Sequence, residues 1–84
     1  MPKRRTLKRE LKHLGPKLLA VRKRLGLSQP QLAARLTSFD IEYGRISTYE
    51  RGYRVPNVLV LLDYARLGGI HIDDLVDDNR ELSF

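Results

Sequence analysis

Hydrogen-bond donors and positive charges gather in one stretch of the chain, from Arg45 to Pro56. If Ile46 marks the centre of a buried helical face, the 3.6-residue period places Tyr49 and Glu50 on the same side. The outward side then carries small and polar residues, namely Gly44, Ser47, Thr48 and Arg51. Hydroxyls and guanidinium groups can bond to phosphates and base edges, so the stretch predicts a helix that docks on DNA. A solvated helix face without a partner is the alternative.

The end of this predicted helix, which spans about residues 42–51, is marked by the residues that follow it. Gly52 supplies a stop where a left-handed backbone is often needed, and Pro56 prevents the helix from resuming nearby. Tyr53 and Arg54 come directly after the stop. We therefore expect them to contact a phosphate backbone beside the helix.

The chain has 84 residues, which suffice for one small domain with a modest core. It contains no cysteine, so neither a disulfide framework nor a thiolate metal site is available. The longest apolar run, Val58 to Leu62, is far shorter than the roughly 20 residues of a membrane span. These features predict a cytoplasmic, nucleoid-associated protein without a membrane partner.

Charge is divided unevenly along the chain, whose formal net charge is +6. Residues 1–14 carry +5, residues 15–56 carry +5 and residues 57–84 carry −4. A basic front and an acidic back would orient the molecule toward a polyanion, and we expect double-stranded DNA to be that partner. An anionic membrane surface is the competing interpretation.

Two helices are predicted before the outward-facing one. The first begins near Pro16 and ends at Gly26, with Lys17 in solvent. Its apolar face is formed by Leu14, Leu18, Val21 and Leu25. The second follows Ser28, which has the spacing of a capping box with Gln31.

A short turn, residues 37–40, leads into the third helix, which we expect to begin at Asp40 or Glu42. Phe39 within this turn is expected to fill the core beneath it, with a partner contact as the alternative.

A fourth helix is predicted from about Asn57, a good N-cap, to Leu67. Its run of residues 58–62 is apolar on all sides, so one buried stripe cannot use every side chain. We expect Leu59 and Val60 to join a homodimer interface. Scattered exposed apolar residues are the alternative.

A short fifth helix is predicted to begin at His71, with Asp73 and Asp74 in its first turn, where negative charge is favoured. The acidic residues after Val76 are expected to be loosely held.

Several motifs occur together in a fixed order: L-G-L-S-Q at 25–29, Q-L-A at 31–33, I-S at 46–47, Y-E-R-G at 49–52, Arg54 with Pro56, and G-I-H-I-D-D-L at 69–75. On these motifs the chain, from about residue 16 to 76, resembles the phage-repressor and Cro-like helix-turn-helix family of the xenobiotic-response-element type. The turn before the third helix is similar to that of a longer-turn variant of the family.

The resemblance implies an all-α fold, a compact five-helix domain like that of lambda repressor. We expect a basic N-terminal arm (residues 1–14), the helix-turn-helix domain (residues 15–77) and an acidic C-terminal tail (residues 78–84). The arm could follow a DNA groove, or it could form a helix that packs on the core or on a second subunit. The implied activity is sequence-specific DNA binding, commonly as a dimer on a palindromic site.

Site residues follow from the same resemblance. It implies phosphate contacts from Arg22, Gln29, Arg51, Tyr53 and Arg54. It also implies that Glu50 orients Arg22 for phosphate, although an ordinary surface ion pair is the alternative. Base contacts would fall to Tyr43, Gly44, Arg45, Ser47 and Thr48.

The start of the third helix departs from the family pattern, because it reads E-Y-G where small polar residues, Gln or Arg are usual. Glu42 brings a negative charge close to phosphates unless it caps its own helix or accepts a hydrogen bond from cytosine N4. Gly44 has no side chain with which to contact a base.

Catalysis has little support in the sequence. His13 and His71 lack a second imidazole at metal-ligand spacing, and neither a nucleophile motif nor a glycine-rich phosphate loop is present. We expect no enzyme, cofactor, metal or small-molecule ligand. Two functions remain. The first is a sequence-specific DNA-binding transcriptional regulator, expected to be a repressor. The second is a protein-interaction module or antitoxin-like adaptor with the same fold and mainly non-specific DNA affinity.

Overall fold

The computed structural model describes residues 11–37 and 40–84. In this part of the chain the regular elements are α1 (Leu14–Leu25), α2 (Gln29–Arg35), α3 (Tyr43–Glu50), α4 (Val58–Gly68) and α5 (Ile72–Val76). The predicted all-α, five-helix fold is confirmed for the described residues. Most of the predicted arm, residues 1–10, and the predicted core residue Phe39 lie outside them.

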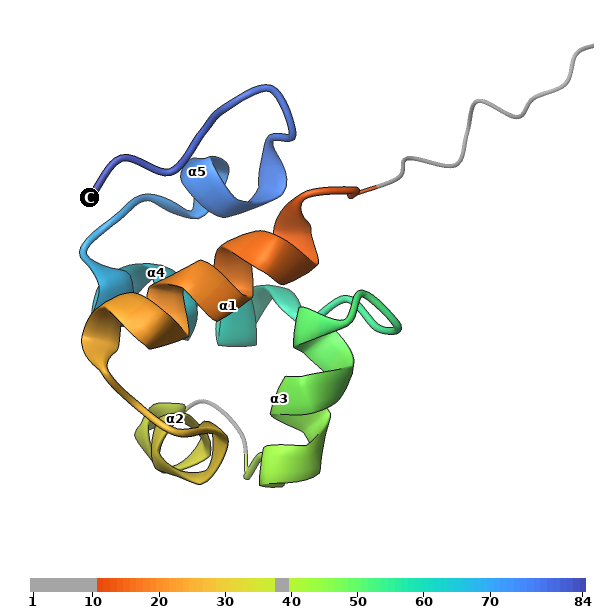
Figure 1. Cartoon of the computed structure of the whole chain (residues 1–84), viewed down its shortest axis with the longest axis vertical. Helices are drawn as coiled ribbons and strands as arrows, with labels where there is room; N and C mark the ends of the chain where they lie inside the picture. The colour runs from red at the N-terminus through yellow and green to blue at the C-terminus, as the bar shows by residue number, and fades with distance from the viewer. Residues whose placement is uncertain (1–10, 38–39) are drawn as a thin grey trace, which may run out of the picture.

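Helix α1 lies at the centre of the arrangement and packs against α3, α4 and α5. In Figure 1, α2 and α3 lie on one side of α1, while α5 and the C-terminal tail lie on the other. Helices α2 and α3 also pack against each other. The helix pair that the sequence predicts to meet DNA is therefore held at one end of the domain.

Capping residues set most helix ends where the sequence predicts them. The Ser28 hydroxyl accepts from Gln31 N at 3.2 Å, and Gln31 Oε1 accepts from Ser28 N at 2.8 Å, which completes the capping box. Asn57 Oδ1 accepts from Leu59 N at 2.7 Å at the start of α4. Two starts differ from expectation: α1 begins at Leu14 rather than Pro16, and α3 begins at Tyr43.

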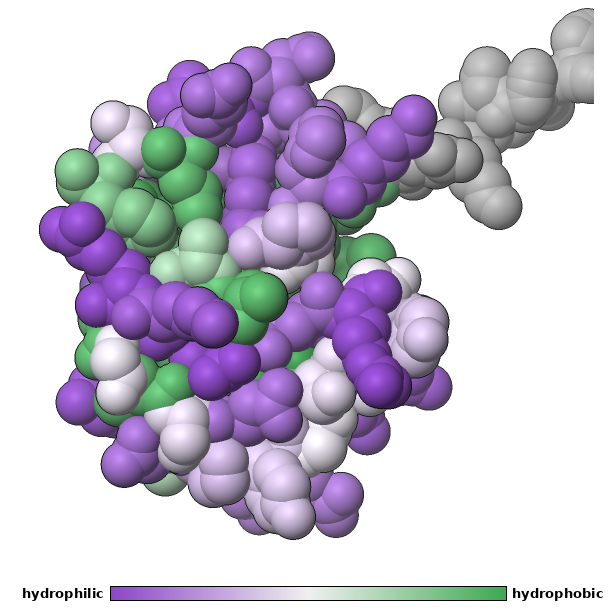
Figure 2. All heavy atoms as spheres, in the orientation of Figure 1, coloured by the Kyte–Doolittle hydropathy of each residue, from purple (hydrophilic) through white to green (hydrophobic). Residues whose placement is uncertain are grey.

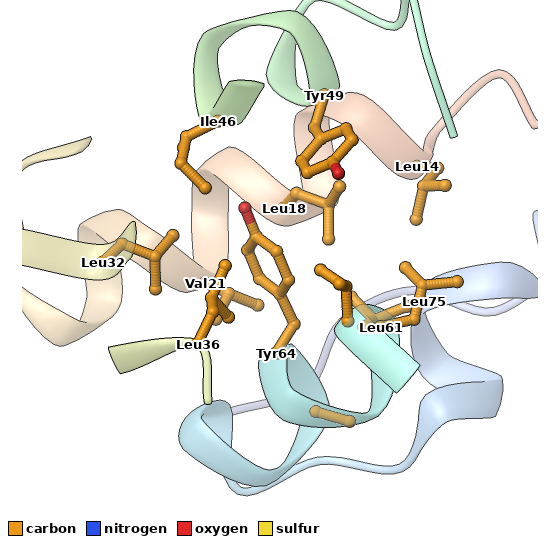
Figure 3. Close-up of a cluster of buried hydrophobic side chains, with 12 residues drawn as sticks. Leu14, Leu18, Val21, Leu32, Leu36, Ile46, Tyr49, Leu61, Tyr64 and Leu75 are labelled. Atoms are coloured by element: carbon orange, nitrogen blue, oxygen red, sulfur yellow. The ribbon is translucent and has the colours of Figure 1, made fainter. Parts of the chain in front are cut away.

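Apolar side chains from all five helices form one core, with the ring of Tyr64 among them (Figure 3). Tyr64 is fully buried, and its hydroxyl has no hydrogen-bond partner among the described residues. Burial raises the pKa of this phenol above its ordinary value. Ile46 and Tyr49 insert into the same core from α3, so they fix which face of that helix points outward.

The prediction that Leu59 and Val60 share an interface is wrong for Val60. Val60 is only 1% exposed because it lies on the face of α4 that packs into the core. Leu59, at 47% exposed, and Val58, at 64%, remain on the surface. An isolated apolar run did not indicate which residues would face inward.

The sequence suggested that Lys17 lies in solvent, but the residue is buried, with 7% of its surface exposed. Its Nζ donates to the backbone oxygens of Asp74 at 2.7 Å and Asp77 at 3.0 Å. The ammonium group thus satisfies carbonyls at the C-terminal end of α5, where a positive charge is favoured.

The acidic C-terminal tail is attached to α1 rather than loosely held. The Asp78 carboxylate accepts from Lys12 N at 2.9 Å and His13 N at 3.3 Å, beside the start of α1. Near the other end of α1, the guanidinium carbon of Arg24 lies 4.8 Å from the ring centroid of Phe84. The tail therefore runs alongside α1, as Figure 1 shows.

Candidate nucleic-acid interface

Gln29 is the first residue of α2, directly after the capping residue Ser28. Pro30 occupies the next position, where its missing N–H costs no helical hydrogen bond. These local features hold the Gln29 side chain beside the end of α3, where its Nε2 donates to Glu50 Oε1 at 3.1 Å. The family resemblance implied a phosphate contact for Gln29 but did not indicate this bond.

Glu50 also receives two bonds from Arg22 of α1. Arg22 Nε donates to Oε2 at 2.6 Å, and Nη2 donates to Oε1 at 3.1 Å. The side chains of Arg22 and Glu50 are only 15% and 7% exposed, so this is not an ordinary surface ion pair. The hydrogen bond with Glu50 raises the pKa of Arg22 and keeps the guanidinium charged.

Arg22 makes one further bond, from Nη1 to the backbone oxygen of Leu27 at 3.0 Å. Leu27 lies between α1 and α2, so Arg22 connects α1, the following turn and α3. We call Arg22, Gln29 and Glu50 the three-helix cluster, because each comes from a different helix of the first three. The cluster holds two predicted phosphate donors next to each other.

The outward face of α3 has open space around Gly44. A Cβ added to Gly44 would meet no atom within 4 Å. Thr48 Oγ1 donates to the Gly44 backbone oxygen at 3.2 Å, which orients its hydroxyl toward its own helix. Tyr43 is 60% exposed at the first position of the helix. Figure 2 shows this part of the surface as mostly hydrophilic or neutral, with apolar colour gathered over other elements.

The remaining predicted base-contact residues lie at different depths on α3. Arg45 is exposed, whereas Ser47 is half-buried like Thr48. The structure therefore brings the predicted residues to one helix, although their contacts with bases stay a prediction.

The chain leaves α3 through a turn that exposes three further donors. Gly52 adopts a left-handed conformation with φ of 79°, as its position at the helix stop requires. The Arg51 guanidinium carbon then lies 5.6 Å from the ring centroid of Tyr53, a cation–π contact that orients the charge. Arg54 follows and is exposed. These residues lie beyond the same end of α3 that Arg22 and Gln29 contact, so the predicted phosphate donors gather at that end.

The acidic residues are unevenly distributed. Five of the ten belong to α5 and the residues after it, which Figure 1 places on the opposite side of α1 from α2 and α3, whereas Asp40, Glu42 and Glu50 lie at or beside α3. Such a separation of charge orients the basic side toward a polyanion.

A family model described as helix-turn-helix matches residues 18–75. The match covers α2, the turn, α3 and most of the surrounding core. The chain belongs to this helix-turn-helix family. Searches of curated proteins and of solved structures found no match.

The match spans α2 and α3, whose order in the chain corresponds to the first helix and the second, or recognition, helix of a helix-turn-helix pair. In such domains the recognition helix occupies the major groove and its N-terminal residues face the base edges. The family match supports a DNA-binding regulator as the general function.

Sequence reasoning did not identify the close contact between Gly15 of α1 and the end of α3. A Cβ added to Gly15 would lie 2.7 Å from the backbone oxygen of Glu50 and 3.1 Å from that of Tyr49. The first turn of α1 therefore touches the last turn of α3. A glycine beside Pro16 was the only sequence signal, and a glycine alone does not identify its neighbour.

The described residues were also compared with the requirements of a metal site and of a membrane-spanning helix. Residues 11–37 and 40–84 contain no group of three or more His, Cys, Asp or Glu side chains placed to hold a metal ion. Within the same residues, no helix has the length and apolar character needed to cross a bilayer.

Proposed function

We propose that this protein is a sequence-specific transcriptional regulator, acting as a repressor, that inserts α3 into the major groove of double-stranded DNA. The observation that carries the proposal is the gathering of phosphate donors at one end of an exposed recognition helix. Arg22 and Gln29 bind its last residue, Glu50, and Arg51, Tyr53 and Arg54 follow directly after it. Repression would follow if the bound protein covers a promoter.

The two sets of donors would position the domain on the DNA backbone. The Gln29 amide has two N–H groups, of which Glu50 receives one, so the other can serve a phosphate oxygen. Phosphate contacts set register and affinity without carrying sequence information. Selectivity then falls to the residues on the outward face, namely Tyr43, Gly44, Arg45, Ser47 and Thr48. No catalytic step is assigned to any of them.

Selection of a random duplex library by the purified protein at near-physiological salt would test this function. An inverted repeat with half-site centres about 10 base pairs apart would support a dimeric regulator. Thr48→Ala should then change the preferred bases at specific positions, whereas Arg54→Gln should weaken binding to all sequences alike. A retained pool identical to the input would contradict sequence-specific binding.

A homodimer is supported by a second observation. Val55, Val58 and Leu59 are exposed at 59%, 64% and 47%, and they lie between the end of the recognition helix and the first turn of α4. A two-fold contact through this surface would place two recognition helices side by side, as a palindromic site requires. Sedimentation of the protein and of Leu59→Lys over a range of concentrations would test the contact. Leu59→Lys and Val55→Lys should each weaken the dimer and shift the protein toward monomer. Arg66→Glu, at the far end of α4, should leave the dimer unchanged.

An interaction module with the same fold is the competing function, since exposed apolar residues can equally bind another protein. In that case changes on the outward face of α3 would leave base preference unaltered. The library selection therefore distinguishes the two functions directly.

A further inference from the structure

Glu42 is the N-cap residue of α3 but does not act as a capping side chain. Its backbone is extended, with φ of −72° and ψ of 144°, and its carboxylate accepts no hydrogen bond from the helix. The capping side chains of Ser28 and Asn57 do accept such bonds at α2 and α4. Among residues 11–37 and 40–84, no hydrogen bond or ion pair engages the Glu42 carboxylate, which is exposed.

A carboxylate in this position is costly if it serves no purpose in DNA binding. The start of the recognition helix is the end that faces the base edges in helix-turn-helix complexes. A negative charge there is repelled by the phosphates on both strands. A compensating partner must therefore be a hydrogen-bond donor on the DNA, and in the major groove only the amino groups of cytosine and adenine are donors.

Gly44, two residues further on, leaves space for such a contact. Its φ is not left-handed, and an added Cβ would meet nothing within 4 Å, so neither the backbone nor the packing requires glycine here. Glycine in a helix interior is unfavourable relative to alanine. The absence of a side chain at this exposed position allows the first turn of α3 to approach the base edges closely.

We propose that Glu42 determines specificity by accepting a hydrogen bond from the N4 amino group of a cytosine at one fixed position in each half-site. The inference rests on the proposed function and deepens it. Cytosine fits because the base presents the N4 donor and no acceptor of its own in the major groove, whereas adenine also presents the N7 acceptor, which would repel a carboxylate. Thymine, which presents the O4 acceptor, is excluded for the same electrostatic reason.

Library selection with the wild type, Glu42→Ala and Glu42→Gln tests the assignment, and Asp40→Asn is the matched control. Asp40 is an exposed carboxylate in the turn before α3, so its removal changes net charge equally. The wild type should prefer cytosine at one position by about 5- to 100-fold in competition with thymine. Glu42→Ala should abolish this preference and leave the other positions unchanged. Glu42→Gln should shift it toward adenine, which an amide can contact through N6 and N7.

The outcomes separate this inference from the proposed function. If the wild type selects a defined site but Glu42→Ala changes no position, the inference is wrong and the regulator function stands. The same conclusion follows if Asp40→Asn alters the same position as strongly. If the wild type selects no sequence, both the inference and the proposed function are wrong. Because the Glu42 side chain is exposed and forms no hydrogen bond or ion pair among the described residues, circular dichroism should show all variants folded.

Discussion

The Cα of Gly15 in α1 faces the backbone oxygen of Glu50 in α3 so closely that an added Cβ would lie 2.7 Å from that oxygen. Glu50 in turn binds Arg22 of α1 through its side chain at 2.6 Å. The last turn of the recognition helix is therefore held from α1 at two points, one backbone contact and one charged contact. Its outward residues are displayed by a helix whose end is fixed.

Gly15→Ala should destabilise the domain by about 1–3 kcal/mol, because the methyl group forces backbone atoms of α1 and α3 apart. Gly44→Ala is the matched control, since its added Cβ meets nothing within 4 Å. That variant should gain up to about 1 kcal/mol from better helix propensity. Urea denaturation measures both free energies of unfolding. Equal stabilities of the two variants would contradict the close contact at Gly15.

Glu50→Ala should lower the free energy of unfolding by about 1–3 kcal/mol, because it leaves the poorly exposed Arg22 guanidinium without its carboxylate. DNA affinity should fall as well, since Arg22 and Gln29 lose the group that positions them. Arg80→Ala provides a comparison, because its ion pair with Asp74 is formed by a side chain that is 51% exposed. That change should have little effect on stability. A larger loss in Arg80→Ala than in Glu50→Ala would contradict the expected order.

Acid should weaken the attachment of the C-terminal tail. Partial desolvation would raise the pKa of Asp78, but bonds from Lys12 N and His13 N outweigh it and hold this pKa below its ordinary value. The Asp78 carboxylate therefore stabilises the fold above the unfolded-state pKa of about 4, and this contribution is lost as pH falls through the lower folded-state pKa.

Asp78→Asn should consequently be less stable near neutral pH and show a smaller loss of stability between about pH 5 and pH 2. Denaturation at a series of pH values measures this slope. Asp40→Asn is the control, because Asp40 lies in the turn before α3, far along the chain from the tail. Equal slopes for Asp78→Asn and the wild type would contradict a role for this carboxylate.

Removing a phosphate contact should reduce the salt dependence of DNA binding. Arg51→Gln and Arg54→Gln should each lower the slope of log K against log salt by about 1 without changing base preference. Arg66→Gln removes the same charge from the last turn of α4 and should leave the slope nearly unchanged. Fluorescence anisotropy over a range of salt concentrations checks all three. An equal effect of Arg66→Gln would indicate that net charge alone determines binding.

Local signals made much of this fold predictable from the sequence. The capping box of Ser28 and Gln31, the cap at Asn57 and the left-handed Gly52 act through neighbouring residues, so the chain itself reveals them. The pairing of Arg22 with Glu50, expected from the family resemblance, is present as well.

The errors concern contacts between residues distant in sequence. Lys17 looked like a solvent-facing residue because its partners, two backbone oxygens near the end of α5, give no signal in side-chain type. Val60 and Leu59 are both apolar, and only the direction in which α4 packs decides which one is buried. The bond of Asp78 to Lys12 N likewise joins residues 66 positions apart, so neither segment indicates it alone.

That last separation has a consequence for how the protein acquires its fold. A contact that closes such a long loop has a large entropic cost and is expected to form late. During synthesis, α1 can pair with α3 before residue 78 has left the ribosome, whereas the Asp78 carboxylate emerges later. The backbone N–H groups of Lys12 and His13 would therefore lack this acceptor until residue 78 has emerged.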